Sequence, residues 1–140
     1  MFDNPKNGPI YPTYVPKTDE DGNEIAGVRL PDVTVPLATY TGWNFRKPSI
    51  GAPNQLVALQ GSYVPFPPAA EARLSRRDPH ASVAERYSSR ERYMQLIQEA
   101  AASLVTGGYL LAGDVPAVVK RASDHFELAV PSRVPATASR

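Results

Sequence analysis

The sequence lacks cysteine entirely and contains only two histidines and one tryptophan in 140 residues. Without cysteine, disulfides and thiolate metal sites are excluded, and two histidines are too few for a histidine-rich metal site. No apolar run approaches the roughly 20 residues that cross a bilayer. The amino terminus, MFDNPKNGPI, has neither the basic nor the apolar segment of a signal peptide. We therefore expect the chain as written to be cytoplasmic, with no membrane partner.

The charge balance gives little reason to expect a polyanionic partner. The formal net charge is +1, which favours neither nucleic acid nor an anionic membrane. Six arginines lie between Glu71 and Arg92, but four acidic residues share that window. A nucleic-acid site would show a stronger basic stripe with stacking aromatic residues. We interpret the window as a solvated helical face with ion pairs, and we expect no nucleic-acid partner.

Catalytic motifs are missing as well. The sequence contains no Gly-x-Ser-x-Gly, no phosphate-binding glycine loop and no HExxH. Asp124 and His125 are adjacent, so a helix would point them about 100° apart, and we interpret them as an exposed acid beside a histidine at a helix end. His80 follows Asp78 and Pro79 in a predicted loop. We therefore predict no catalytic, cofactor-binding or metal-binding residues, and no cofactor.

Proline is the residue type in excess, and its placement divides the chain. Twelve of the 15 prolines lie at or before Pro79, and proline disrupts helices and the interior of sheets. The sequence therefore predicts one α+β segment. Residues 1–68 are expected to form extended chain, a β-hairpin and loops, residues 69–126 to be helical, and residues 127–140 to be a flexible tail. Residues 1–12 are expected to be coil.

The hairpin is predicted at an Asp-Gly turn. Asp21 and Gly22 stand between apolar residues, and glycine supplies the positive φ that such a reversal needs. We expect strands at about Tyr14–Lys17 and Glu24–Arg29. Asp19, Asp21 and Asn23 also resemble the start of a calcium loop, but Gly22 and Leu30 occupy the wrong positions for an EF-hand. We favour a solvated hairpin tip over a calcium site.

The stretch Pro31–Phe45 contains the only tryptophan and two further aromatic residues. Val33 and Val35 alternate with polar residues, which predicts a half-buried strand. Pro36 is expected to end it or to keep it at a sheet edge. The residues after it are expected to turn Trp43 inward. Tyr40, Trp43 and Phe45 are interpreted as a packing or docking surface and not as a ligand site.

The second half of the chain predicts helices. Ala69–Arg77 favours a short helix by propensity, and two capping boxes follow, at Ser82–Glu85 and Ser88–Glu91. The second box is expected to open a helix over Ser89–Thr106, whose apolar positions recur at intervals of three and four. A last helix is expected over Val115–Phe126, capped by Asp114. The short connection predicts that these two helices pack as an antiparallel pair.

Several motifs, in order along the chain, resemble a known family. They are VPKTDEDGNEIAGVRLPDVTVPLATYTGWN, GSYVPFP, a DPxxSxxERY pattern and LVTGGYLLAGDV, at residues 15–44, 61–67, 78–87 and 104–115. Over residues 12–122 the chain resembles the C-terminal region of bacterial proteins with an alpha/beta-hydrolase domain. Those proteins are similar to esterases.

The resemblance implies a piece of a serine hydrolase without its catalytic residues. A serine nucleophile needs a strand-turn-helix elbow, and no position in this sequence matches that elbow or its partners. We expect an accessory C-terminal segment, inactive alone, whose partner is a hydrolase core domain or a second copy of the chain. The alternative is a stand-alone protein-interaction module with a partner of another kind.

Overall fold

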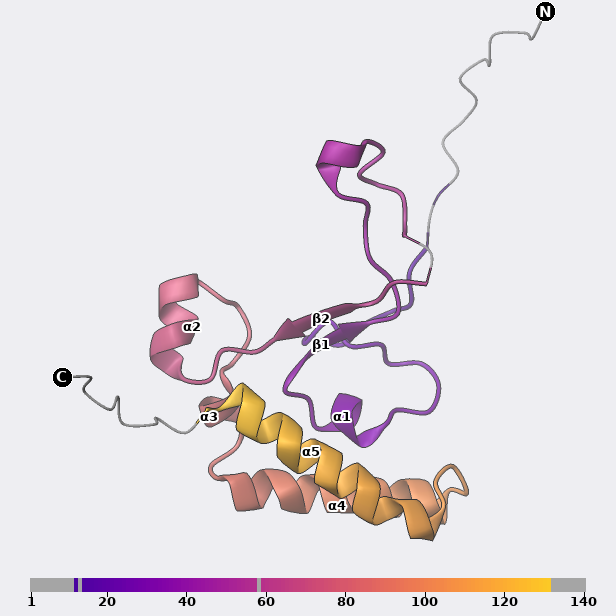
Figure 1. Ribbon diagram of the computed structural model, residues 1–140, viewed down its shortest axis with the longest axis vertical. Coiled ribbons are helices and arrows are strands. Elements are labelled where there is room, and N and C mark those ends of the chain that lie inside the picture. Colours follow the sequence, from indigo (N-terminus) through magenta and orange to yellow (C-terminus); the bar gives the residue numbers. More distant parts are fainter. Residues whose placement is uncertain (1–11, 13, 58, 132–140) are drawn as a thin grey trace, which may run out of the picture.

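The computed structural model describes residue 12 and residues 14–57 and 59–131, so the coil expected for residues 1–11 and the end of the expected tail, residues 132–140, lie outside the described residues. The helices are α1 (Pro31–Thr34), α2 (Ala70–Arg76), α3 (Val83–Arg86), α4 (Arg90–Thr106) and α5 (Val115–Ala129). The strands are β1 (Ala38–Thr41) and β2 (Ser62–Pro65). Two 3-10 turns are also present, η1 (Pro48–Ile50) and η2 (Ala112–Asp114). Figure 1 shows α4 and α5 side by side, the small sheet beyond them, and the loop with η1 projecting farther out. The predicted α+β class is confirmed.

The two strands form an antiparallel pair with a defined register. Ala38 faces Pro65 and Tyr40 faces Tyr63 across the ladder, and the Phe66 N–H donates to the Leu37 carbonyl at 3.0 Å just beyond it. In an antiparallel ladder, hydrogen-bonded pairs alternate with pairs that exchange no hydrogen bond. Ala38 and Pro65 form a pair of the second kind, so the missing N–H of the proline leaves no ladder bond unmade. The extended segment predicted from GSYVPFP is therefore β2.

The outer edge of β1 is covered by one side chain from the preceding turn. Asn23 is fully buried. Its amide nitrogen donates to the Ala38 carbonyl at 3.2 Å, and its amide oxygen accepts from the Tyr40 N–H at 2.7 Å. The Asn23 side chain thus takes the place of a third strand and satisfies two backbone groups that would otherwise be unpaired.

The predicted Asp-Gly turn forms, but its flanking strands do not. The Gly22 N–H donates to the Asp19 carbonyl, and the only ladder contact is a single antiparallel bridge between Thr18 and Glu24. Asp19 Oδ1 accepts from the backbone N–H groups of Asp21 and Asn23, which tightens the turn into a local loop. The prediction of strands at Tyr14–Lys17 and Glu24–Arg29 is wrong because the loop is held by side chains and by β1.

The strand predicted around Val33 and Val35 is also wrong: this segment is the single helical turn α1. Pro31 stands at its first position, where the missing N–H costs nothing. The carbonyl of Val33, near its end, accepts from the Arg29 guanidinium at 2.9 Å. Pro31 and Val35 are buried, four residues apart as on a helix and not two as on a strand. Two alternating residues are too short a pattern to separate these structures.

The hydrophobic core lies between the sheet and the α4–α5 pair. Ser89 accepts from the Arg92 N–H and caps α4, and the apolar spacing then places Tyr93, Ile97 and Ala101 on one buried face. The pair is antiparallel, since Arg90 at the start of α4 donates to Glu127 in the last turn of α5. The buried core residues that contact one another are Val35, Leu37, Phe66, Val83, Tyr87, Tyr93, Ile97 and Ala122.

Several helix predictions hold and others need correction. The first capping box is complete at α3, with the Ser82 and Glu85 side chains bonded to each other's backbone N–H groups. The second box is wrong by one residue, because the cap of α4 is Ser89 and not Ser88. Asp114 precedes α5 without a side-chain cap, and α5 continues to Ala129. The flexible tail therefore does not begin at residue 127.

Replacing Asn23 with alanine should destabilise the whole fold. The change removes two hydrogen bonds and leaves a buried carbonyl and N–H of β1 unpaired, which costs about 2 to 3 kcal/mol of unfolding free energy. Urea denaturation measures this loss. Asn54→Ala, at an exposed asparagine of the projecting loop, is the matched control and should change stability by less than about 0.5 kcal/mol. Equal effects of the two substitutions would contradict the role assigned to Asn23.

Candidate functional sites

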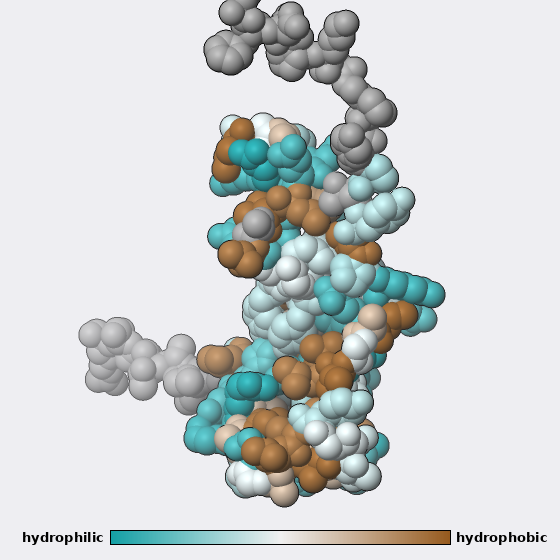
Figure 2. Space-filling model, turned by 90° about the vertical axis from the view of Figure 1, so that its right-hand side faces the viewer, coloured by the Kyte–Doolittle hydropathy of each residue, from teal (hydrophilic) through white to brown (hydrophobic). Residues whose placement is uncertain are grey.

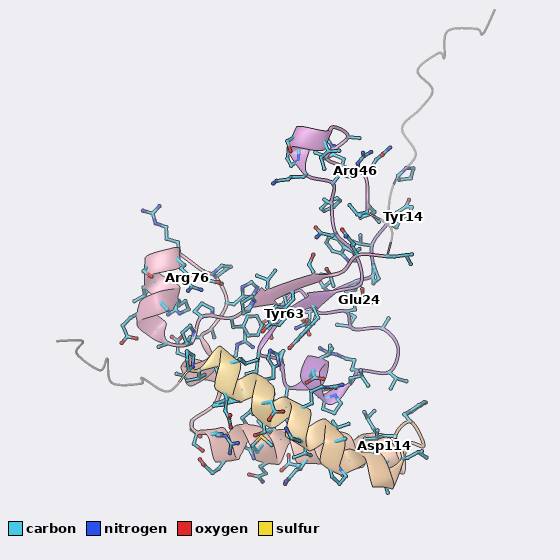
Figure 3. The ribbon with its side chains drawn as sticks, in the orientation of Figure 1. Tyr14, Glu24, Arg46, Tyr63, Arg76 and Asp114 are labelled. Carbon is cyan, nitrogen blue, oxygen red and sulfur yellow. The ribbon has the colours of Figure 1, made fainter. Side chains whose placement is uncertain are left out.

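A cluster of two tyrosines and one histidine joins the sheet to α5. Tyr40 and Tyr63 are cross-strand neighbours with ring centroids 5.6 Å apart, and the His125 ring lies 5.6 Å from Tyr63 and 6.4 Å from Tyr40. Figure 3 shows Tyr63 between the sheet and α5. The Tyr63 hydroxyl is 2.7 Å from His125 Nε2, and the Tyr40 hydroxyl is 3.4 Å from Nδ1. Both ring nitrogens of His125 therefore face phenols.

Burial shifts the pKa of all three groups of this cluster toward the uncharged form. It lowers the pKa of His125, while Asp32 nearby raises that pKa and Arg121 lowers it. Burial also raises the pKa of Tyr40 and of Tyr63. A neutral imidazole between two neutral phenols is consistent with this environment, since removing a charge from water is costly.

The cluster is not arranged for nucleophilic catalysis. A triad needs a serine, threonine or cysteine within hydrogen-bond reach of the histidine. In the part of the chain that the structure describes, no such side chain bonds to His125, whose partners are the two tyrosines. The adjacent Asp124 turns to Lys120, 2.6 Å away. The cluster anchors α5 on the sheet through His125, Tyr40 and Tyr63.

The sequence does not reveal the position of His125. Interpreted as a helix-end residue, it lies instead inside α5, half-buried and five residues before the C-cap Val130. Its contacts depend on which tyrosines face α5, and that follows from the strand register. The depression beside it measures about 340 Å³ and is bordered by Asp32 of α1 and Arg121 of α5, which form an ion pair at 2.5 Å.

A second cluster ties the Asp-Gly turn to α3. Arg86 donates to both carboxylate oxygens of Asp21, at 2.7 Å for Oδ2, and its guanidinium lies 4.2 Å from the ring centroid of Phe66. Asp19 pairs with Arg29 at 2.6 Å. The carboxylates that suggested a calcium loop are thus bound to arginines. Among the described residues, no group of three or more His, Asp or Glu side chains is placed to hold a metal ion.

The third feature is a projecting hairpin, residues 42–61, which we call the finger. Its two sides are joined by a bridge between Phe45 and Leu56 and by backbone bonds from Arg46 to Gln55 and from Val57 to Asn44, at 3.0 and 2.9 Å. The turn η1 forms its tip. The finger leaves the sheet on the side away from the helices (Figure 1), and η1 makes no substantial contact with another helix or strand.

Apolar side chains of the finger are exposed. Phe45 is 49% exposed, Ile50 66%, and Leu59 fully. Figure 2 shows hydrophobic atoms beside hydrophilic ones along the narrow upper part of the molecule, where the finger lies. Trp43 packs edge-on against Phe45 with centroids 5.3 Å apart, and its indole N–H is buried without an acceptor among the described residues.

The structure separates the three aromatic residues that the sequence grouped. Trp43 and Phe45 contact each other at the base of the finger, whereas Tyr40 belongs to the cluster with Tyr63 and His125. None of the three belongs to the hydrophobic core, so Trp43 does not turn into the core as expected but lies half-buried against Phe45.

These features define a small α+β unit with a projecting finger and, in the described residues, no serine-centred catalytic group. The family model described as Alpha/beta hydrolase domain matches residues 3–120. The chain belongs to that family, which confirms the resemblance seen in its motifs. No curated protein and no solved structure matches the chain. Among the described helices, none is both long and apolar enough to span a membrane.

The stability of the fold should depend on pH through His125. Its pKa in the folded chain lies below the ordinary value of 6.5, so between those two values the unfolded chain binds more protons. Unfolding free energy should therefore rise as pH increases through the interval just below 6.5, and this gain should be lost on acidification. The pKa values of Asp78, Glu85 and Glu91 are lowered as well. These carboxyl groups change the unfolding free energy only below their ordinary pKa values of 3.8 and 4.5, outside this interval.

Urea denaturation at a series of pH values measures the effect, and NMR titration of the histidine ring protons gives the pKa of His125 directly. His125→Gln should remove this contribution to the slope, and His80→Gln, at the other histidine, should leave it in place. A His125 pKa at or above 6.5 in the folded chain would contradict the assigned burial.

Proposed function

We propose that this chain is the C-terminal accessory portion of an esterase-like alpha/beta hydrolase and is not catalytic by itself. It packs on a hydrolase core domain through the finger, with Trp43 and Phe45 at the contact and Tyr40 in the sheet that supports them. The observation that carries this proposal is the finger itself, an ordered apolar projection supported by the sheet and left uncovered by the helices.

Family membership and the missing motif support a partner that carries the serine. Members of an alpha/beta-hydrolase family place the nucleophile on a sharp turn between a strand and a helix. The sequence has no Gly-x-Ser-x-Gly, and the described sheet consists of two antiparallel strands. Both observations support a hydrolase core outside these residues as the source of the family's chemistry.

The energetics of the finger support a docked state. Exposed large apolar side chains gain about 1.5 to 3 kcal/mol each when they are fully buried, and contiguous apolar surface on a small protein marks an interaction site. At one end of the molecule, Leu59 offers that gain in full and the partly exposed Phe45 and Ile50 offer part of it. The isolated chain keeps a separate hydrophobic core between the sheet and α4, so the finger can dock without unfolding the rest.

Docking should depend on the apolar side chains of the finger. The probe is the serine-hydrolase core of a longer member of the same family, expressed as a separate chain, with binding measured by calorimetry. The double variant Phe45→Ala, Ile50→Ala should weaken binding at least about tenfold, equivalent to about 1.4 kcal/mol. The matched control Tyr109→Ala, Leu128→Ala removes two exposed apolar side chains from the helical end of the chain and should bind within about twofold of the parent.

The chain alone should not hydrolyse a chromogenic ester. Turnover above buffer that a serine-reactive inhibitor abolishes would contradict the accessory role. Binding of the chain to itself and not to the hydrolase core would favour self-association through the same surface and would reject the proposed partner.

A further inference from the structure

The charges of the finger are all of one sign. Residues 42–61 contain two charged side chains, Arg46 and Lys47, and no acidic residue. The chain as a whole has 15 basic and 14 acidic residues, so the finger is a basic segment of a nearly neutral protein. It is also the segment that carries Phe45 and Ile50 into solvent.

Neither cation is neutralised by a carboxylate among the described residues. The Arg46 guanidinium has one long contact, 3.4 Å to the amide oxygen of Gln55, and Lys47 takes part in no ion pair. Elsewhere in the chain most arginines pair with acids; these are Arg29, Arg73, Arg86, Arg90, Arg92 and Arg121.

The two cations border an apolar groove. The groove has a volume of about 660 Å³, and its lining includes Phe45, Pro48, Ile50 and Val57 together with Arg46 and Lys47. Figure 3 shows Arg46 on the finger, well away from the helical pair. An apolar floor with cations along it complements a surface of opposite charge and similar polarity.

We propose that the finger docks on an apolar surface of the hydrolase core that is rimmed by aspartate or glutamate side chains. This inference rests on the proposed function and specifies the chemistry of the partner's surface. Burial of Phe45 and Ile50 provides affinity. Arg46 and Lys47 pair with the carboxylates at the rim, where they speed association and fix the orientation of docking.

Two consequences distinguish this contact from purely apolar docking. Pairs at a solvent-exposed rim are screened by salt, because the Debye length falls from about 14 Å at 50 mM to about 4 Å at 500 mM salt. Binding of the parent chain to the hydrolase core should therefore weaken as salt increases, whereas an apolar contact alone would hold or strengthen. Reversing the two charges should place like charges against the rim and repel the partner.

The test compares two charge-reversal variants with the same change in net charge. Arg46→Glu, Lys47→Glu alters the finger. Arg76→Glu, Arg77→Glu alters two adjacent exposed arginines at the end of α2, which also form no ion pair among the described residues. The probe is again the separately expressed serine-hydrolase core of a family member. Calorimetry at about 50 and 500 mM sodium chloride gives the dissociation constants.

The finger variant should bind at least about tenfold more weakly than the parent at low salt, with little salt dependence, and the α2 variant should stay within about threefold of the parent. Circular dichroism and thermal melting establish that each variant is folded. If the finger variant does not fold, the salt dependence of the parent alone decides.

Parent binding that is insensitive to salt, or equal binding by parent and finger variant, would overturn the acidic-rimmed surface while leaving the proposed function intact. Equal loss in both variants would assign the effect to net charge and would also overturn it. No binding of the parent at either salt concentration would reject the proposed function and, with it, this inference.

Discussion

The Asn23 side chain fixes the geometry on which the other features depend. Its two hydrogen bonds hold the Asp-Gly turn against the outer edge of β1, and the Asp21–Arg86 pair holds the same turn against α3. β1 is thereby placed between the turn and β2. The β1–β2 ladder sets Tyr40 opposite Tyr63, and those two rings contact His125 of α5. The Asn23 amide links the amino-terminal loop to the sheet, and the sheet contacts the last helix through these two rings.

This arrangement divides the chain into a part that packs against itself and an exposed part, the finger. The helices, the sheet and the Tyr40–Tyr63–His125 cluster bury their contacts within the chain. The finger continues from the ends of the same two strands, so the sheet sets its direction. Its tip, η1, makes no substantial contact with another described helix or strand. An internally packed base with an exposed apolar end suits the proposed docking of the finger on a hydrolase core. The pKa shifts of the cluster favour its uncharged form, which suits a structural anchor better than an acid–base centre.

The sequence predicts the local features that depend on a few neighbouring residues. The Ser82–Glu85 capping box, the Gly107 end of α4 and the Asp21-Gly22 turn all form as their chemistry indicates. The features that failed depend on distant contacts. Val33 and Val35 enter a helical turn because Pro31 begins it and Arg29 binds its carbonyl end.

The candidate sites were less predictable than the helices. His125 was interpreted as a helix-end residue because the sequence shows neither the extra turn of α5 nor the tyrosines that face it. Tyr40, Trp43 and Phe45 looked like one cluster because they are close in sequence, but β1 ends at Thr41 and only Tyr40 lies in the strand. The finger's exposure depends on where the helices pack, which no local pattern contains. The motifs did indicate the family, because a family match depends on ordered residues and not on their contacts.

Amide hydrogen exchange, compared between the chain alone and the chain mixed with the serine-hydrolase core of a family member, tests the central claim most directly. The account predicts new protection of backbone amides within residues 42–61, with exchange in α4 and α5 unchanged. Finger amides that exchange equally with and without the hydrolase core, or protection confined to α4 and α5, would contradict the account.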